Sequence, residues 1–485
     1  MSKPGLPQGT RDFGPETVYK RNFIFDTIRS VFELYGYEPL ETPAMENLDT
    51  LLGKYGEEGD KLIFKILNNG LDLDSKKAAA RIAFENILAG KNDKSITERA
   101  LRYDLTIPFA RYVASHQHEL SFPFRRYQLQ PVWRADRPQK GRYREFWQCD
   151  ADVVGSRSMM NEVELTQIYL TVFEKLGIEV ELRINHRKIL AGLAEATGGA
   201  EKTIDITTAI DKLDKIGIEK VKAELTEKNL SDNHVGLIEK YLRLSGNNAE
   251  RLDELIRLIP NEITESGIAD LRLILGFFEE TASGNRTIKI NSPTTSKRTE
   301  SGNRTRKPDE PAASDKVVLD FSLARGLNYY TGIIFEVRAK GVQIGSIGGG
   351  GRYDDLTGLF GVPNIPGVGI SFGVDRIYDV MEELKLFPPA VQRSTQVLFF
   401  NMGEQAAKQS YDLMQALRRE GIRCELFHEP AKFDKQFKYA ERKGIPRIII
   451  IGEDEILSSH AKVKDLGSGI QSEIKFEDLI KHFKE

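Results

Sequence analysis

The first strong pattern of apolar and polar positions predicts an amphipathic helix. Pro15 suits the first position of a helix, and Glu16 places a negative charge in its first turn. Gly36 ends the pattern, and residues 37–42 form a short extended segment before Pro43. The apolar residues between these ends recur at helical spacing and predict one buried face: Ile24, Ile28, Val31, Phe32 and Tyr35.

The middle of the chain changes from a strand pattern to a helix pattern. Between residues 100 and 155, aromatic and β-branched residues separated by a polar loop predict strands. Residues 187–282 carry apolar residues at helical spacing, which we interpret as the short amphipathic helices of an inserted domain. Residues 283–314 are rich in Ser, Thr, Asn, Arg and Pro. A segment with so few apolar groups cannot bury enough apolar surface to offset the conformational entropy that it would lose on ordering. The composition therefore predicts a mobile loop.

The last part of the chain predicts a separate small domain. Strand-like sequence runs from Val317 to about residue 375, and Pro388-Pro389 then marks a linker. Beyond it, strands and helices alternate, which predicts an α/β domain with a largely parallel sheet. The expected strands are 396–400, 423–427 and 447–451, and the expected helices are 404–420 and 434–443.

The composition describes a soluble protein of two or three domains. The chain has 485 residues, of which 40% are hydrophobic and 29% charged. No apolar run approaches the roughly 20 residues that cross a bilayer, and the N-terminus has no apolar stretch suited to secretion. Cys149 and Cys424 suggest no disulfide framework, which favours the cytoplasm. With the scattered histidines they give no zinc-ligand spacing, so we expect no structural metal.

The net charge of −3 argues against a polycation that binds nucleic acid over its whole surface. Charge is nevertheless concentrated locally, because residues 125–144 contain seven basic residues and only Asp136 as an acid. A solvated basic loop and a polyphosphate or nucleic-acid site both fit this charge. The order of the residues must decide between them.

The run from Val132 to Asp152 predicts a hairpin with a basic tip, because apolar segments flank the sequence RPQKG. An ordinary strand with a solvated face is one alternative. Functionally, Arg134 could hold a phosphate by a bidentate fork, Phe146 could stack on a purine, and carboxylates could meet an amine or imidazole N–H. Alternation in the returning strand places four residues on one face: Phe146, Gln148, Asp150 and Asp152.

This run resembles motif 2 of class II aminoacyl-tRNA synthetases, and its tip RPQKGRYR is similar to that of histidyl-tRNA synthetases in particular. The segment 322–332 resembles a peptide of the histidine-specific branch. There the arginine, here Arg325, approaches the α-phosphate, where a fixed guanidinium stabilises developing charge. The tyrosines, here Tyr329 and Tyr330, line the imidazole pocket. Asn328 stands where that family usually has Asp, which removes a possible anionic partner.

Two glycine-containing segments extend the resemblance. The segment 345–354 matches neither a Walker A loop nor a Rossmann fingerprint. Its four successive glycines would let backbone approach a ligand or strand closely, and it resembles the second histidine-branch peptide. The segment 367–377 predicts a strand running into a helix and resembles motif 3, whose arginine, here Arg376, clamps the ATP γ-phosphate. A helix arginine taken alone would be solvated.

Three weaker matches complete the resemblance. The segment 101–108 resembles the loop that receives the substrate α-amino group, although Asp-x-Thr alone would be an ordinary turn. The helix before Pro43 fits motif 1, the usual homodimer element. Residues 393–485 resemble the anticodon-binding domain of this synthetase subgroup, while Lys435 and Lys438 fit an ordinary helix face equally well.

The resemblance implies an α+β fold, in which an antiparallel sheet flanked by helices carries a helical insertion and a C-terminal α/β anticodon-binding domain. Residues 1–186 and 315–388 would form the catalytic domain. The insertion would span residues 187–314, with its mobile loop at 283–314, and the anticodon-binding domain would span 393–485.

The implied reaction is activation of histidine by ATP with Mg²⁺, followed by transfer to tRNA(His), in a cytoplasmic homodimer without membrane contact. Arg325 and Arg134 would be catalytic. Histidine would be bound by Asp104, Leu105, Thr106, Arg134, Gln148, Asp152, Arg325, Tyr329 and Tyr330. ATP would be bound by Arg134, Asp136, Arg142, Phe146 and Arg376. The acceptor end of the tRNA would meet Arg137, Gln139 and Lys140.

Other classes of protein remain as competitors. A catalytically inactive, histidine-binding regulatory paralogue of histidine biosynthesis would typically lack the terminal domain and the catalytic arginines. A class II synthetase for glycine, proline or threonine would lack the 325–330 peptide. A pure RNA-binding or scaffold protein would have little need for three phosphate-directed arginines.

Overall fold

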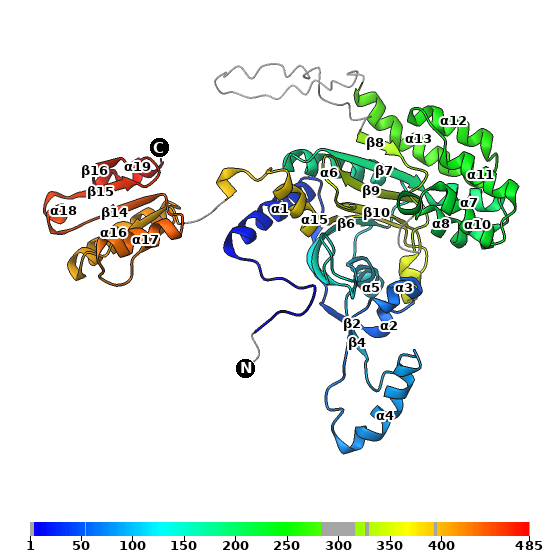
Figure 1. The fold of residues 1–485 in the computed structure, drawn as a ribbon, viewed down its shortest axis with the longest axis horizontal. Helices are drawn as coiled ribbons and strands as arrows, with labels where there is room; N and C mark the ends of the chain where they lie inside the picture. Colours follow the sequence, from blue (N-terminus) through cyan, green and yellow to red (C-terminus); the bar gives the residue numbers. More distant parts are fainter. Residues whose placement is uncertain (1–3, 54, 283–315, 325–328, 392–394, 485) are drawn as a thin grey trace. The chain divides into compact units, whose positions relative to one another are not determined.

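The computed structural model describes residues 4–53, 55–282, 316–324, 329–391 and 395–484 (Figure 1). The chain divides into two compact units, Met1–Phe387 and Pro388–Glu485. No helix within the described ranges is long and apolar enough to cross a membrane.

The first unit is built on an eight-stranded sheet of order β1-β5-β6-β11-β10-β9-β7-β8. Neighbouring strands run antiparallel except for the edge pairs β1/β5 and β7/β8. The predicted α+β class and antiparallel sheet are therefore confirmed. The strands are β1 (Glu38–Pro39), β5 (Phe124–Trp133), β6 (Glu145–Val154), β7 (Val180–His186), β8 (Val317–Leu319), β9 (Ile333–Ala339), β10 (Gly348–Tyr353) and β11 (Gly367–Gly373).

Three helices cover one face of this sheet: α1 (Pro15–Leu34), α6 (Met160–Leu176) and α15 (Val374–Glu383). The predicted apolar face of α1 is buried, with Ile24, Ile28 and Val31 at 0% exposure. Cys149 and Ala151 of β6 belong to the same core. Side chains along a strand alternate between its two faces. The four β6 residues that the sequence placed on one face therefore lie on the opposite face of the sheet: Phe146, Gln148, Asp150 and Asp152.

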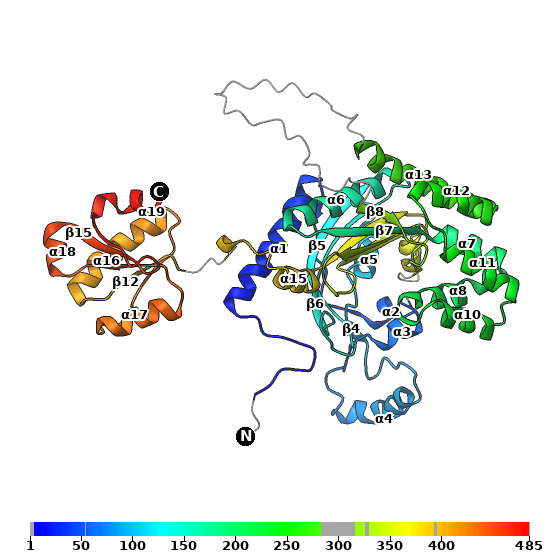
Figure 2. The same cartoon turned by 45° about the horizontal axis from the view of Figure 1, so that its top comes forward.

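Helix α5 (Thr106–His116) lies on that opposite face and corrects the prediction of strands throughout residues 100–155. Ile107, Ala110 and Val113 recur every third position and pack into one core cluster, so the helical period prevails over β-branched composition here. A small sheet lies nearby and consists of β2 (Met45–Asn47), β3 (Lys65–Ile66) and β4 (Arg99–Leu101). The helices of this region are α2 (Leu48–Leu51), α3 (Gly56–Lys61) and α4 (Asp74–Leu88). Helix α4 extends away from the sheet (Figures 1 and 2).

The predicted helices of residues 187–282 are present and gather near the β7/β8 side of the sheet (Figure 2). They share one continuous hydrophobic core with the sheet and its helices, because Leu271 and Ile274 pack in the same cluster as Leu182. The proposed loop at 283–314 lies outside the described residues. The helices are α7 (Arg187–Ala196), α8 (Thr203–Ile210), α9 (Leu213–Ile216), α10 (Ile218–Glu227), α11 (Asp232–Leu242), α12 (Asn248–Leu258) and α13 (Glu262–Ala282).

The second unit contains the predicted alternation of strands and helices around a five-stranded sheet of order β13-β12-β14-β15-β16. Only β12/β13 and β12/β14 are parallel, so the expected largely parallel sheet is wrong: a hairpin, β15–β16, adds two antiparallel pairings at one edge. The elements are β12 (Val397–Phe399), α16 (Glu404–Arg419), β13 (Cys424–Leu426), α17 (Phe433–Arg442), β14 (Arg447–Ile450), α18 (Glu453–Ser458), β15 (His460–Asp465), β16 (Gln471–Lys475) and α19 (Leu479–Lys484).

The run of four glycines forms strand β10 in the interior of the large sheet. A Cβ atom on Gly350 would lie 2.2 Å from the carbonyl oxygen of Gly369 on β11. Glycine is therefore required there for the close approach of two backbones, as the sequence suggested.

We expect Gly350→Ala to destabilise the protein by more than about 2 kcal/mol, because the obstructing atom is backbone and cannot move aside. Gly236→Ala is the matched control. That position lies inside α11 with open space around it, so alanine should add up to about 1 kcal/mol of stability. Chemical denaturation measures both, and equal stability of the two variants would contradict the assigned packing.

Candidate active site

Asp104 is a buried carboxylate placed directly before α5, with 2% of its surface exposed. The Tyr55 hydroxyl donates to Asp104 Oδ1 over 2.9 Å, the backbone N–H of Ile107 donates to the same oxygen over 3.1 Å, and the Tyr329 hydroxyl donates to Oδ2 over 3.2 Å. Burial raises the pKa of Asp104, and these donors oppose the rise. Asp104 therefore fixes Tyr329 against the start of α5.

Asp152 on β6 forms a second buried carboxylate centre on the same face. Its Oδ1 accepts a hydrogen bond of 2.5 Å from the Tyr353 hydroxyl, and its Oδ2 lies 2.9 Å from Nη2 of Arg126. The Tyr330 ring lies 5.1 Å from that of Tyr329, centroid to centroid. Burial raises the pKa of Tyr330, and the charges of Asp152 and Asp104 raise it further. Acidic groups and tyrosine rings thus gather in one buried polar cluster on this face of the sheet.

Arg134 follows β5 and lies between two aromatic rings. Its Nε donates to the backbone oxygen of Tyr103 over 3.1 Å. Its guanidinium carbon lies 4.3 Å from the centroid of the Tyr103 ring and 5.1 Å from that of Phe146. The arginine and the aromatic residue that the sequence assigned to phosphate and purine are therefore neighbours.

Arg376 of α15 approaches the same place from another part of the chain. Its Nε donates to the Gly141 carbonyl over 2.7 Å, and its Nη1 donates to the Ser346 carbonyl over 2.6 Å. Burial lowers its pKa, and the charges of Arg134 and Arg142 lower it further. In the described part of the chain no carboxylate lies within ion-pair distance of Arg134 or Arg376. Two neighbouring guanidinium groups of this kind favour the binding of an anionic ligand.

The tip of the β5–β6 hairpin packs against α15. Asp136 is paired with Arg142 over 2.9 Å, and the Tyr143 hydroxyl donates to Asp379 of α15 over 3.2 Å. Lys140 is exposed and contacts Glu383 over 2.9 Å. The other two residues assigned to the tRNA, Arg137 and Gln139, are also exposed.

The structure thus brings most of the sequence-predicted residues together in two neighbouring groups. Leu105 is buried, its carbonyl accepts from Arg126 over 3.3 Å, and Thr106 begins α5. Gln148 donates to the Ser371 hydroxyl over 2.8 Å. Arg325 and Asn328 lie outside the described residues.

Sequence reasoning did not assign three residues that organise the pocket. Tyr353 lies in the glycine-rich segment 345–354, and its position after the glycines is the signal that could have assigned it to the site. Tyr55 and Arg126 carried no local signal, because their roles arise from contacts with Asp104 and Asp152, which are distant in sequence.

Comparison with known proteins identifies the family of the chain. The family model for histidyl-tRNA synthetase matches residues 91–377, and that for an anticodon binding domain matches residues 396–485. A histidine–tRNA ligase of Christiangramia forsetii is 50% identical over 480 residues, which cover 98% of both chains. The chain belongs to the histidyl-tRNA synthetase family. A ligase of the same name from Bacteroides fragilis is also 50% identical, over 99% of this chain and 98% of its own.

Solved structures of the histidyl-tRNA synthetase family share the fold. The crystal structure of the synthetase from Nostoc has a TM-score of 0.78 at 29% identity, covering 100% of this chain and 99% of its own. The apo enzyme of S. aureus has a TM-score of 0.65 at 20% identity, covering 100% of both chains, which supports the fold alone.

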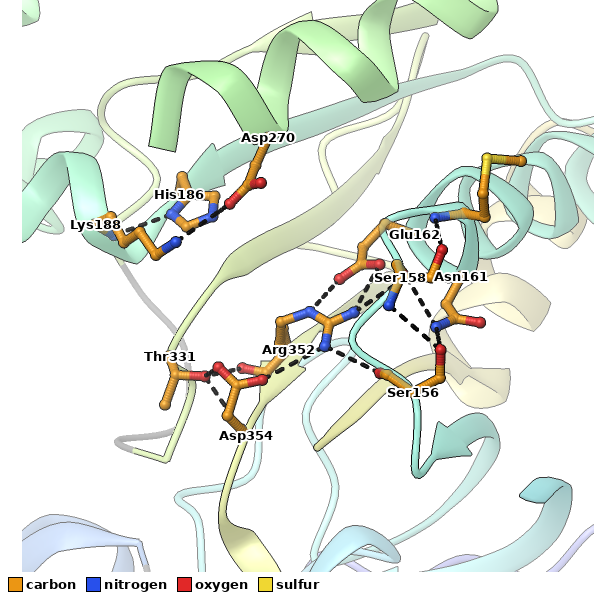
Figure 3. A network of polar contacts seen from close by, with 11 residues as sticks. Ser156, Ser158, Asn161, Glu162, His186, Lys188, Asp270, Thr331, Arg352 and Asp354 are labelled. Atoms are coloured by element: carbon orange, nitrogen blue, oxygen red, sulfur yellow. Dashed lines mark hydrogen bonds and ion pairs between the residues drawn. The ribbon is translucent and has the colours of Figure 1, made fainter. Parts of the chain in front are cut away.

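A buried ion pair supports the histidine-branch segment at Tyr329–Gly332 (Figure 3). Arg352 of β10 donates to both carboxylate oxygens of Glu162 on α6, over 2.5 and 2.9 Å. Its backbone oxygen accepts from the Thr331 N–H over 2.8 Å, and Thr331 also donates to Asp354 over 2.7 Å. A Cβ on Gly332 would lie 2.9 Å from the Arg352 side chain. Arg352 therefore holds this segment against the sheet.

His186 connects the same region to the helices of residues 187–282 (Figure 3). Its Nδ1 accepts from the backbone N–H of Lys188 over 3.0 Å, and its Nε2 lies 3.1 Å from Asp270 Oδ2 on α13. Burial lowers the pKa of His186, which favours a neutral ring with the proton on Nε2. The end of β7, the start of α7 and helix α13 are thereby joined.

We expect Glu162→Gln to destabilise the protein by about 3 kcal/mol, because it leaves the buried Arg352 charge without its carboxylate. Asp26→Asn, which removes a carboxylate paired with Arg29 on the exposed side of α1, is the control and should change stability little. Thermal or urea unfolding provides the measurement. Equal effects of the two substitutions would show that the buried pair has no special structural role.

Proposed function

We propose that this chain is a histidine–tRNA ligase that activates histidine with ATP and then transfers it to tRNA(His). The observation that carries the proposal is the meeting of Arg134 and Arg376, from two distant motifs, beside a cluster of carboxylates and tyrosines. Two cations that pair with no carboxylate among the described residues fit a polyphosphate, and acidic acceptors fit the amine and ring N–H of histidine.

In the first step, a carboxylate oxygen of histidine attacks the α-phosphorus of ATP, and the bond to pyrophosphate breaks. Arg134 and Arg325 would stabilise the charge that develops on the α-phosphate, and Arg376 would hold the γ-phosphate. Phe146 would stack on adenine, while the Asp136–Arg142 pair borders the nucleotide. In the second step, the 3′-terminal hydroxyl of the tRNA attacks the histidyl carbonyl, and AMP leaves.

Mg²⁺ would enter with the nucleotide. Magnesium usually retains waters and takes substrate phosphates together with one or two carboxylates. The carboxylates whose charges act on Arg376 are Asp136, which is paired with Arg142 over 2.9 Å, and Glu336, which is paired with Arg338 over 2.9 Å. Either could complete a shell of phosphate and water oxygens and partly neutralise the phosphates.

The histidine itself would lie on the sheet face beside α5. Asp104, Thr106 and Gln148 would bind the amino group, with Leu105 forming part of the wall. Asp152, Tyr329 and Tyr330 would surround the imidazole. A site of this kind rejects amino acids that lack a ring N–H, because its buried polar groups would then be left unpaired.

The tRNA would contact both units. Arg137, Gln139 and Lys140 project from the hairpin tip and would meet the acceptor end, and the second unit would bind the anticodon. Helix α1 with β1 would form the homodimer element of motif 1. Both cysteines are free and buried, which suits the reducing cytoplasm.

The whole-length relatives favour this function over a regulatory paralogue. A structure titled as an ATP phosphoribosyltransferase regulatory subunit/histidyl-tRNA synthetase, from Bacillus halodurans, is 22% identical with a TM-score of 0.69 over 93% of this chain and 99% of its own, and supports the fold alone. The ligases at 50% identity match over nearly the full length, including the second unit.

The direct test is ATP–pyrophosphate exchange with each of the twenty amino acids. We expect exchange with histidine alone, and we expect Arg376→Ala to slow it by at least about 100-fold (~2.7 kcal/mol), since a phosphate-directed charge is lost. Lys435→Ala, on the second unit, serves as the control and should leave exchange unchanged. Exchange with another amino acid, or none with histidine, would refute the proposal.

Removal of residues 388–485 should separate the two steps. The first unit has its own core, so exchange should persist, whereas aminoacylation of tRNA(His) should fall by at least about tenfold because anticodon contacts are lost. Charging assays with the full chain and the truncated chain measure the difference. Equal loss of both activities would contradict an anticodon role for the second unit.

A further inference from the structure

The segment of residues 7–13, which precedes α1, lies along the β5–β6 hairpin. The backbone N–H of Arg144 donates to the Gly9 carbonyl over 2.9 Å, and the Arg144 carbonyl accepts from the backbone N–H of Arg134 over 2.9 Å. A Cβ on Gly9 would lie 2.7 Å from the Arg144 side chain and 2.9 Å from that of Pro138. The segment therefore packs closely on the hairpin at the point where β5 and β6 end.

Arg11 joins this segment both to the hairpin and to α15. Its guanidinium carbon lies 3.3 Å from the centroid of the Tyr143 ring, and its Nη2 pairs with Oδ1 of Asp375. Asp375 is buried, with 4% of its surface exposed, and its Oδ2 accepts from the backbone N–H of Trp147 over 3.0 Å. One guanidinium thus contacts an aromatic ring of the hairpin and a buried carboxylate at the start of α15.

The tip of the hairpin also contacts α15 directly. Arg376, the residue after Asp375, donates from its Nε to the Gly141 carbonyl over 2.7 Å, and the Tyr143 hydroxyl donates to Asp379 over 3.2 Å. These contacts and those of Arg11 all restrict the same movement, the separation of the hairpin from α15. A cation held against a ring in a partly buried place contributes more than the same contact at an exposed surface.

We propose that Arg11 is a positioning residue for the nucleotide, which holds the hairpin against α15 so that Arg134 and Arg376 reach one triphosphate together. The inference rests on the proposed function and adds to it a residue outside the substrate sites. A hairpin that is correctly placed for only part of the time lowers the apparent affinity for ATP by that fraction. Histidine binding should change less, because Asp104 and Tyr329 hold each other in place by a hydrogen bond.

Arg21 of α1 makes it possible to remove Arg11 without leaving a buried charge unpaired. Its Nη1 lies 2.6 Å from the same oxygen of Asp375, and the side chains of this pair are each 5% exposed. In an Arg11→Ala variant the Asp375 carboxylate keeps a cationic partner, which avoids the large cost of breaking a buried ion pair. The substitution should therefore release the hairpin while the first unit stays folded.

The test compares wild type with Arg11→Ala in histidine-dependent ATP–pyrophosphate exchange. We expect the KM for ATP to rise by about five- to thirtyfold, the effect of one partly desolvated cation–aromatic contact. The KM for histidine, and kcat at saturating ATP, should stay within about twofold. Arg29→Ala, which removes an exposed cation of α1 paired with Asp26, is the control and should change none of these values. An unchanged KM for ATP, or equal rises in both KM values, would overturn the inference.

A double substitution tests whether Arg11 acts through the hairpin ring. Tyr143→Leu removes the ring that Arg11 contacts, so either single change breaks the same link. The KM for ATP of the double variant should exceed that of the weaker-binding single variant by less than about twofold. If the two effects multiply in full, Arg11 does not act through Tyr143 and the inference is wrong.

Amide hydrogen–deuterium exchange needs no substrate and separates this inference from the proposed function. In wild type the Arg144 N–H is hydrogen-bonded to the Gly9 carbonyl. Arg11→Ala should speed exchange across residues 139–144 by at least about fivefold, while strand β11 in the sheet interior should exchange as in wild type. Unchanged exchange in the hairpin would contradict the positioning role. Absence of histidine-dependent ATP–pyrophosphate exchange in wild type, with faster hairpin exchange in the variant, would refute the proposed function alone.

Discussion

The site depends on the absence of side chains from two neighbouring strands. A Cβ on Gly369 would lie 1.9 Å from Asp152 Oδ1, and one on Gly351 would lie 2.9 Å from the Tyr330 ring. Gly369 and Gly351 therefore leave the volume that Asp152 and Tyr330 fill. The sheet can bury carboxylates and tyrosines at this depth only because its own strands are bare there.

Two groups of buried charges lie along the sheet face. Carboxylates gather beside the tyrosines, whereas Arg134 and Arg376 approach each other near the hairpin. Neither arrangement favours the folded state by itself, since burial raises the pKa of the acids and lowers that of Arg376. The cationic amine of an amino acid would offset the cost of the buried carboxylates. A triphosphate would offset the cost of the buried arginines, so the site is suited to hold both ligands side by side.

The parts that carry these groups are fixed by buried pairs rather than by loops. The Arg352–Glu162 pair joins β10 to α6, and His186 with Asp270 joins β7 to α13 (Figure 3). Removal of Glu162 is costly because the Arg352 charge then remains unpaired in a medium of low dielectric constant. His186 is neutral and joins Asp270 by a hydrogen bond. Pocket geometry and the folding of the first unit are in this way linked.

The sequence by itself determined the elements whose period is local. Helix α1, the basic hairpin, the alternating face of β6 and the passage from β11 to the arginine-bearing helix could all be predicted from spacing, and residue order in the motifs identified the family. Tertiary structure alone decided the rest. It brought Tyr55 to Asp104 and Arg126 to Asp152. These outcomes depend on which distant strands and helices meet, and a pattern within a few residues carries no information about such contacts.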